Sequence, residues 1–398
     1  VLGDGTAQMP YLIENASQLA YMANEINSNA VAYADAYFEL VADIDLNVYN
    51  WTPIGTSDNP FQGHFNGNDH TIDNLNITIL NSNSPQYVGL FGYVRNAEIS
   101  NIHILGNGTI YVQGLNTTFY IGSVAGYATG SIVDSCSNQS DIIVNHTGTT
   151  TSYNTYLGGL VGYLTGRLSY ITNSINQGKI NFGIRLELTN SSSYTWRHYI
   201  GGIAGSTYYA TIESCGNLDT LFLMNDVTTY SKTSYIYAGG ITGYTYGTSA
   251  SPVNIRKNYN KGKIILNNKA ASNSGSYFAE AWGYIGGIAG YCSTDYITIS
   301  DCYNRGDLQP NAYSYRSNYR NYSYNYVGGI TGYLNTNSTI TITNCYNTGN
   351  VPSTYTAYAG YAGTGTIVYN HDCFAHNAST YTQTNNNYYL NTCGCTMN

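Results

Sequence analysis

The feature that most constrains this chain is a short glycine-rich block that recurs along its length. Each copy combines one or two leading glycines with an aliphatic residue and a closing glycine, usually followed by tyrosine. The copies are Gly89–Tyr93, Gly122–Tyr127, Gly158–Tyr163, Gly201–Gly205, Gly239–Tyr244, Gly286–Tyr291 and Gly328–Tyr333, with a degraded copy at Gly360–Gly363. Successive first glycines lie 32 to 47 residues apart. This period is typical of stacked repeat units.

A second block follows each first one, 14 to 19 residues after its first glycine. It places a small residue two positions before an asparagine: Cys136, Ser174, Cys215, Asn258, Cys302 and Cys345. The asparagine shortly before a glycine suggests a left-handed turn residue. The distance between the first and second blocks varies less than the whole repeat period. The variable length therefore lies mostly in the Tyr/Ser/Thr-rich inserts that follow the second block.

The residues of each unit predict short strands. Apolar and hydroxyl residues alternate with period two in Ile297–Ser300 and Ile340–Thr343, so one face is buried and the other meets water. The glycine blocks are unsuited to helices, since each glycine costs about 1 kcal/mol relative to alanine. One unit cannot bury its apolar face alone, whereas units stacked coil upon coil can. The sequence therefore predicts an all-β fold, a β-solenoid.

One segment, Asn15 to Ile26, predicts a helix. Leu19, Met22, Ala23 and Ile26 fall on one stripe, and Asn15 or Ser17 can cap its start. We expect this short N-terminal helix to cover the open edge of the first coil, although a binding role is the alternative. The expected organisation is a cap over residues 1–35, first coils over 36–85, solenoid repeats over 86–385 and a C-terminal tail over 386–398.

With these motifs, the sequence resembles the GLUG-repeat family of large surface proteins, over residues 36 to about 390. The resemblance includes a segment that precedes such repeats, here Leu40–Leu46, Trp51–Gly55 and Phe61–Ile72. It implies a right-handed parallel β-helix in an extracellular, secreted or cell-surface setting, and it implies no catalytic residue.

Charge and hydropathy narrow the possible partners. Only 9% of the residues are charged, the net charge is −8, and no Lys/Arg cluster could neutralise several phosphates, so we expect no nucleic-acid partner. No apolar run approaches the roughly 18 residues of a membrane span. The chain starts at Val1 without a signal-like stretch, as expected of a processed, secreted protein.

The eight cysteines divide into two groups. Those at the repeat position, to which Cys373 also belongs, share it with serine and asparagine, which favours buried free thiols over disulfides. Cys292, Cys393 and Cys395 lie outside that register and are the disulfide candidates. Histidines are isolated and no pair of CxxC elements occurs, so we expect no metal and no cofactor.

Catalytic motifs are sparse. No HExxH occurs, and the densest histidine cluster, His371 and His376 around Asp372, fits a surface loop. The close acid pairs, Asp43 with Asp45 and Asp69 with Asp73, fit solvated turns better than the paired acids of a polysaccharide-cleaving β-helix enzyme. The sequence therefore predicts that the protein is not an enzyme.

Tyrosine is the compositional outlier, with 44 residues. One insert carries six of them: Tyr313, Tyr315, Tyr319, Tyr322, Tyr324 and Tyr326. In an extended insert, tyrosines of equal parity form a ladder on one face. Such a ladder is a candidate surface for self-association or for glycan contact, and the alternative is a solvated sheet face without a partner.

Three functions remain open on the sequence alone. The first is an extracellular structural protein whose solenoids self-associate into a fibre, sheath or surface layer, with copies of itself or other surface proteins as partners. The alternative is an adhesin or glycan-binding surface module. The third is a β-helix enzyme acting on polysaccharides.

Overall fold

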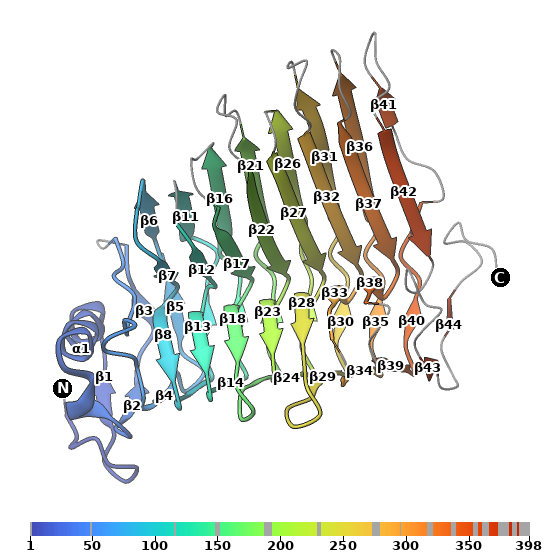
Figure 1. Ribbon diagram of the computed structural model, residues 1–398. Coiled ribbons are helices and arrows are strands. Elements are labelled where there is room, and N and C mark those ends of the chain that lie inside the picture. Colours follow the sequence, from blue (N-terminus) through green and yellow to red (C-terminus); the bar gives the residue numbers. More distant parts are fainter. Residues whose placement is uncertain are drawn as a thin grey trace.

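The computed structural model describes residues 2–47, 50–114, 117–147, 152–186, 193–228, 232–272, 279–294, 296–316, 321–335, 340–352, 357–359, 366–372, 382–383 and 388–389. Their strands form five parallel sheets, in which each strand pairs with its equivalent from the coil before and the coil after. This is the predicted parallel β-helix with an N-terminal helix (Figure 1).

We call the five sheets A to E. Sheet A contains β1 (Tyr11–Ile13), β2 (Tyr37–Leu40), β4 (His64–Asn66), β9 (Glu98–Ser100), β14 (Ile132–Asp134), β19 (Tyr170–Thr172), β24 (Thr211–Glu213), β29 (Val253–Arg256), β34 (Ile297–Ser300), β39 (Ile340–Thr343) and β43 (Thr382–Gln383). Sheet B contains β3 (Ile44–Asp45), β5 (Thr71–Asp73), β10 (His103–Ile104), β15 (Ser137–Asn138), β20 (Ile175–Asn176), β25 (Gly216–Asn217), β30 (Tyr259–Asn260), β35 (Tyr303–Asn304), β40 (Tyr346–Asn347) and β44 (Tyr388–Tyr389). Sheet C contains β8 (Phe91–Arg95), β13 (Ala125–Thr129), β18 (Val161–Thr165), β23 (Ala204–Tyr208), β28 (Thr242–Tyr246), β33 (Ala289–Cys292) and β38 (Thr331–Leu334).

The other two sheets are built from the variable inserts. Sheet D contains β6 (Ile77–Leu80), β11 (Thr109–Gly114), β16 (Asp141–Thr147), β21 (Ile180–Leu186), β26 (Leu221–Thr228), β31 (Ile264–Ser272), β36 (Leu308–Arg316) and β41 (Ala357–Ala359). Sheet E contains β7 (Gln86–Val88), β12 (Phe119–Ile121), β17 (Asn154–Gly158), β22 (Tyr194–Gly201), β27 (Lys232–Gly239), β32 (Ala279–Gly286), β37 (Tyr322–Gly328) and β42 (Thr366–Asp372).

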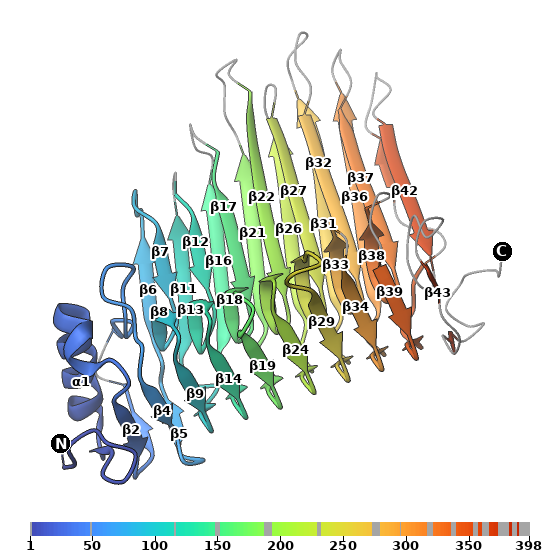
Figure 2. The ribbon, with the colours of Figure 1, turned by 60° about the horizontal axis from the view of Figure 1, so that its bottom comes forward.

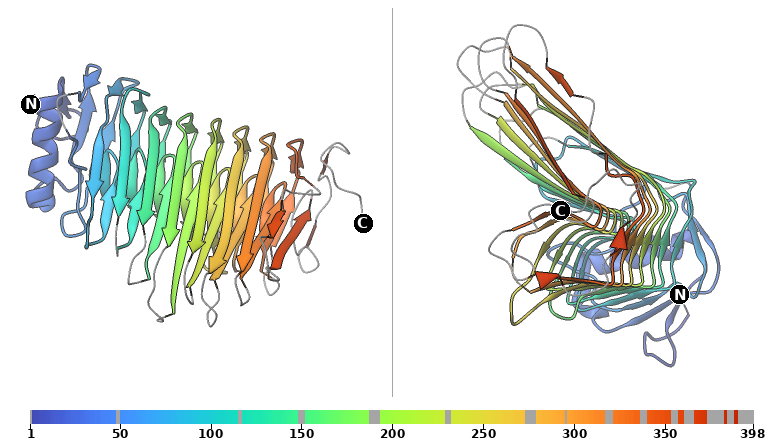
Figure 3. Two further views of the ribbon diagram at one scale, coloured as in Figure 1. Left: turned by 90° about the horizontal axis from the view of Figure 1, so that it is seen from above. Right: turned by 90° about the vertical axis from the view of Figure 1, so that its right-hand side faces the viewer.

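Each coil runs through sheets D, E, C, A and B in that order. Sheets D and E project from the body of the solenoid and pack face to face, as the view along the axis shows (Figure 3). We call this pair of sheets the wing. The wing widens along the chain, because the strands of sheet D lengthen from four residues in β6 to nine in β31 (Figures 1 and 2).

The cap forms as the apolar stripe predicts. Helix α1 (Ala16–Asn29) is capped by Asn15, whose side chain accepts a hydrogen bond from the backbone N–H of Gln18 at 3.1 Å. It buries Leu19, Met22, Ala23 and Ile26, and a 3₁₀ turn, η1 (Ala30–Tyr33), follows it. Among the described residues, no helix has both the length and the apolar character needed to cross a membrane.

One contact between the two sequence blocks explains why they recur together. In the coil that contains Gly202, a Cβ on this glycine would lie 2.2 Å from the carbonyl oxygen of Gly240 and 2.4 Å from Cγ of Asn217. The second glycine of the first block therefore makes room for the asparagine of the second block, and the same holds for Gly159 with Asn176 and Gly287 with Asn304. Only glycine permits backbones to approach this closely.

The asparagines of the second block form an internal ladder. Five hydrogen bonds of 2.8 to 2.9 Å join six of them, each from a side-chain N–H to the side-chain oxygen of the next: Asn138, Asn176, Asn217, Asn260, Asn304 and Asn347. Their predicted role as left-handed turn residues is wrong, because each lies in a two-residue strand of sheet B with extended backbone and directs its amide into the coil interior. The left-handed residues lie just before the small residue of the block instead, as at Asn173, Ser214 and Asn344.

Candidate functional site: stacked tyrosines where sheets E and C meet

The outward face of sheet E carries one column of tyrosines that continues through seven coils. Parallel pairing places equivalent residues of successive coils directly beside each other, so one tyrosine per coil produces a stack of rings. The column consists of Tyr87, Tyr120, Tyr156, Tyr199, Tyr237, Tyr284 and Tyr326, with successive ring centroids 4.9 to 5.2 Å apart.

Sheet C carries a second column, supplied mostly by the tyrosine that closes the glycine block. It consists of Tyr93, Tyr127, Tyr163, Tyr208, Tyr244, Tyr291 and Tyr333, with centroids 4.5 to 5.7 Å apart. In the coil where the block lacks its tyrosine, Ser206 occupies the paired position. The ring of Tyr208, two residues later on the same strand, fills the gap and keeps the column continuous.

The two columns pack edge to face against each other at the junction of the sheets. Tyr199 and Tyr244 are 5.1 Å apart with ring planes at 64°, and Tyr284 and Tyr291 are 5.2 Å apart at 86°. These are the preferred geometries of aromatic pairs. Tyr199, Tyr237 and Tyr284 are 7 to 8% exposed, so the columns form a second apolar core outside the coil. We call these two columns the double tyrosine ladder.

Burial in the ladder changes the acidity of the phenols. Burial, followed by the charges of neighbouring tyrosines, raises the pKa of Tyr291 to about 12 and that of Tyr199 further above its ordinary value. Outside the ladder but on the same strand as Tyr326, burial and the charge of Glu280 raise the pKa of Tyr324 to about 12. These phenols stay neutral at physiological pH, where they can donate and accept hydrogen bonds at the rim of the ladder.

The tyrosines of the insert singled out from the sequence do not form one patch. Tyr322, Tyr324 and Tyr326 lie on the outward face of β37, as their spacing predicts, and Tyr326 belongs to the double tyrosine ladder. Tyr313 faces outward from β36 in sheet D, on the opposite side of the wing. The expectation of a single surface is corrected here, because the insert folds back on itself between two sheets that pack face to face. Of Tyr315 only the backbone is described, and Tyr319 lies outside the described residues.

A shorter aromatic column continues outward along sheet E. Tyr324 stacks on Trp282 with centroids 3.8 Å apart, and Trp282 stacks on Tyr235 at 5.7 Å. The guanidinium of Arg197 lies 5.6 Å from the centroid of the Tyr235 ring, within reach of a cation–π contact. Aromatic rings therefore extend from the sheet junction toward the tip of the wing.

The outward face of sheet D holds a shallow groove of about 420 Å³. Its lining includes Tyr313, Met224 and the side chains of Asn267 and Asn311, which are hydrogen-bonded to each other at 2.9 Å. Asp226 lies in the same groove, with Lys269 Nζ 3.0 Å from its carboxylate. This face thus combines an aromatic ring with amide, carboxylate and ammonium groups.

Sequence reasoning missed the double tyrosine ladder. It assigned the tyrosines of interest to one insert, although the closing tyrosine of each glycine block was visible as a repeated position. It also missed a third stack, Tyr259 with Tyr303 and Tyr346 on sheet B, whose signal is the tyrosine directly before the asparagine of the second block.

The described cysteines of the repeat position are buried thiols outside any disulfide, as predicted, and Cys373 lies outside the described residues. Cys136, Cys215, Cys302 and Cys345 face the interior, and burial raises the pKa of Cys136 and Cys215 to about 12. The disulfide prediction for Cys292 is wrong: it is a buried free thiol whose paired neighbours in sheet C are Thr245 and Leu334. Cys393 and Cys395 lie outside the described residues.

The acid pairs singled out from the sequence take part in local hydrogen bonds. Asp43 accepts a hydrogen bond from the backbone N–H of Thr71 at 2.8 Å and lies 3.3 Å from His70 Nδ1, and Asp69 lies 3.4 Å from His103 Nε2. Within the described ranges, no three His, Cys, Asp or Glu side chains are grouped so that they could hold a metal ion. Of His371 and Asp372 only the backbone is described, and His376 lies outside the described residues.

Two curated proteins match part of the sequence. One, from Evansella cellulosilytica and described as a Gly-rich membrane protein, is 33% identical over 137 residues. The other, halomucin from Haloquadratum walsbyi, is 30% identical over 176 residues. The matches cover 33% and 41% of this chain, but only 14% and 2% of those much longer proteins. No family model matches the chain.

Among solved structures, a candidate immunoglobulin A1 protease from Bacteroides ovatus is similar to this chain. It is 16% identical, with a TM-score of 0.43, and the match covers 94% of this chain and 86% of that one. A second structure, described as IgA1 protease, is also 16% identical, with a TM-score of 0.40 over 77% of this chain and 21% of that one.

These structures correct the expectation that the protein is not an enzyme. Both similar structures carry the name of a protease, and the prediction of a non-enzyme is withdrawn. A likeness at this identity concerns the fold, and it assigns neither a reaction nor a catalytic residue to this chain.

Proposed function

We propose that this chain is a rigid β-solenoid segment of a surface or secreted protein, with a structural or adhesive role. The observation that carries the proposal is the continuity of its columns along the solenoid axis. The double tyrosine ladder crosses seven coils without a gap, and the asparagine ladder joins six. Stacked rings, and hydrogen bonds between buried side-chain amides of neighbouring coils, oppose bending and separation of the coils.

The surface setting is supported by the two curated relatives, one described as a membrane protein and the other as halomucin. Membership of the GLUG-repeat family is part of the same proposal, supported by the two recurring blocks. The setting is tested on intact cells that express the full-length parent protein, with antibodies against this chain. Labelling without permeabilisation supports it, and labelling only after permeabilisation contradicts it.

Rigidity is tested by small-angle scattering and negative-stain electron microscopy of the purified chain. We expect one straight, elongated particle of constant length. A broad distribution of bent shapes, or a compact globule, would overturn the structural role.

A finer part of the proposal is self-association into a fibre, sheath or layer. The outward face of sheet D carries a mostly apolar column on which a second copy could pack. It contains Tyr111, Ile143, Phe222 and Ile265, with the polar Asn181 between Ile143 and Phe222. Phe222 is 42% exposed, unusual for so large an apolar side chain in a strand. Association through this face would remove the column from water.

Sedimentation velocity over a range of concentrations tests this finer part. We expect assemblies that grow with concentration and are lost in Phe222→Ser. Leu168→Ser is the matched control, because Leu168 is 69% exposed outside sheet D. A chain that stays monomeric at high concentration, or equal effects of both substitutions, contradicts association through sheet D.

A glycan ligand is the second candidate, favoured by the groove around Tyr313. Its aromatic ring, amides and carboxylate are the groups with which proteins stack on and hydrogen-bond sugars. Glycan-array binding that Tyr313→Ser abolishes supports it, and Tyr322→Ser on the opposite side of the wing is the control. Binding lost equally in both variants contradicts a site in this groove.

A further inference from the structure

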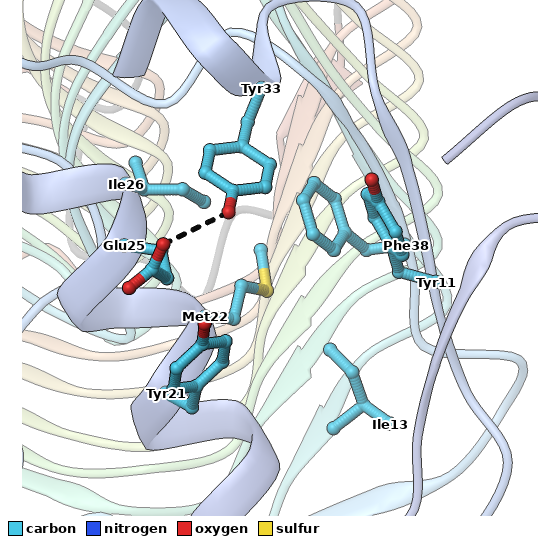
Figure 4. Close-up of a pocket in the computed structure, with 8 residues that line it drawn as sticks. All are labelled: Tyr11, Ile13, Tyr21, Met22, Glu25, Ile26, Tyr33 and Phe38. Atoms are coloured by element: carbon cyan, nitrogen blue, oxygen red, sulfur yellow. Dashed lines mark hydrogen bonds between the residues drawn. The ribbon is translucent and has the colours of Figure 1, made fainter. Parts of the chain in front are cut away.

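A pocket lies where the cap meets the first coils (Figure 4). It has a volume of about 290 Å³, close to the lower limit for small-molecule sites. Tyr11 and Phe38 come from β1 and β2, Tyr33 from η1, and Tyr21 and Glu25 from one side of α1. Met22, Ile13 and Ile26 complete the walls.

Three aromatic rings of the pocket are set at angles to one another. The centroids of Tyr11 and Phe38 are 5.4 Å apart, and that of Tyr33 lies 6.3 Å from each, with planes inclined by 40 to 66°. Rings that are tilted rather than stacked turn faces and edges toward a shared space. The face of an aromatic ring carries partial negative charge and attracts a cation within about 6 Å of its centroid.

Glu25 adds a formal negative charge to this aromatic lining. Its carboxylate accepts a hydrogen bond from the hydroxyl of Tyr33 at 3.1 Å, and it forms no salt bridge with Lys, Arg or His within the described ranges. Burial and this carboxylate together raise the pKa of Tyr33. The pocket is therefore apolar and aromatic on most sides, with one carboxylate that no Lys, Arg or His of the described residues neutralises.

We propose that this pocket binds a small organic ammonium ion, such as a methylated amine. Its apolar substituents would pack against the rings and Met22, while its charge would lie between the ring faces and Glu25. A neutral ligand of the same shape gains only the apolar contacts, and a strongly hydrated metal cation gains little from the rings. This proposal does not depend on the structural role of the solenoid.

The test compares choline with its uncharged isostere, 3,3-dimethyl-1-butanol, by calorimetric or NMR titration of the full chain. We expect choline to bind about tenfold more tightly than the alcohol, as a desolvated cation–π contact with a nearby carboxylate predicts. Equal affinity for the two probes would show a merely apolar pocket, and no binding of choline would overturn the site.

Substitutions distinguish binding in this pocket from a general electrostatic attraction between choline and the protein. Glu25→Gln should weaken choline binding about tenfold and leave the alcohol unaffected, since only the charge is removed. Glu14→Gln is the matched control, because Glu14 is exposed near the same helix and does not line the pocket. Phe38→Leu should weaken choline binding while circular dichroism stays unchanged. An equal loss in the Glu14 and Glu25 variants would overturn the proposal.

The ammonium group could be that of a free molecule or of a lipid headgroup. Co-sedimentation with phosphatidylcholine vesicles, against phosphatidylglycerol vesicles as control, distinguishes the two sources. Choline binding without co-sedimentation identifies a free ligand, and co-sedimentation that choline displaces identifies the headgroup. Co-sedimentation that choline does not displace would contradict this pocket as the site.

Discussion

Gly202 lies directly against Asn217, so close that a Cβ on the glycine would come within 2.4 Å of Cγ of the asparagine. The two residues belong to different sequence blocks of one coil, 15 positions apart. Asn217 also receives a hydrogen bond from Asn176 and donates one to Asn260. One glycine position thus controls whether the interior amide ladder can form, which explains why the two blocks recur together.

We expect Gly202→Ala to destabilise the protein severely. The added methyl would also lie 2.2 Å from the carbonyl oxygen of Gly240, so backbone as well as side chain must shift. Overpacking of this kind costs about 1 to 3 kcal/mol or more. Chemical denaturation followed by circular dichroism measures the loss.

Gly183→Ala is the matched control for that substitution. Its added Cβ would meet the flexible end of Met224 at 3.3 Å and Asn145 at 3.4 Å, and no backbone closer than 4 Å. We expect a change in stability within about 1 kcal/mol, because the chain at this position can accommodate a methyl. Equal effects of the two substitutions would contradict the role of close backbone approach.

Asn217→Ala should destabilise the protein by about 2 to 4 kcal/mol. The substitution leaves the Nδ2 of Asn176 and the Oδ1 of Asn260 each without one buried partner, and each unmet group costs about 1 to 3 kcal/mol. Denaturant midpoints of the two proteins give the difference. Asn311→Ala, which removes an exposed amide pair on sheet D, should stay within about 0.5 kcal/mol. A comparably small effect at Asn217 would show that the interior ladder does not stabilise the fold.

The stacked tyrosines of sheets C and E predict a two-step alkaline titration. Exposed or unfolded tyrosines ionise near pH 10, whereas burial raises the pKa of Tyr291 and Tyr324 to about 12. Because the folded state holds these protons longer than the unfolded state, stability should fall as the pH rises from about 10 to 12. Absorbance at 295 nm reports tyrosinate formation. A single step near pH 10 in the folded protein, as in guanidinium, would contradict the buried ladder.

The sequence was sufficient to predict the fold because the stacking signal is local and repeated. The glycine blocks, the alternation in Ile297–Ser300 and Ile340–Thr343, and the stripe of α1 each point to one burial pattern, and the structure shows it. Buried free thiols followed from the exchange of cysteine with serine and asparagine at one position.

The candidate site was less predictable, because it depends on where inserts of variable length turn back. Tyr313 and Tyr324 are close in sequence, yet they face opposite sides of the wing. Conversely, Tyr244 and Tyr291 are 47 positions apart but stack at 5.7 Å. Such contacts depend on the register between successive coils. Because the repeat period varies between 32 and 47 residues, this register cannot be read from single inserts.

The interior of the wing predicts a loss of stability in mild acid. His146 and His198 are fully buried between sheets D and E, and Thr155 Oγ1 lies 3.1 Å from a ring nitrogen of each. Burial lowers the pKa of His146 to about 4, and it lowers that of His198 well below its ordinary value. Both side chains are therefore neutral in the folded wing.

Because unfolding allows these histidines to bind protons near pH 6.5, stability should be constant above about pH 7 and fall as the pH decreases toward 4. His146 alone should account for a loss on the order of 2 kcal/mol at pH 5. Thermal midpoints between pH 7.5 and 4.5 measure this dependence, which His146→Gln should reduce. His103→Gln, which removes a histidine from the partly exposed face of sheet B, should leave the dependence intact. Equal slopes in the His146 variant and the unmodified chain would show that acid sensitivity arises elsewhere than in the wing.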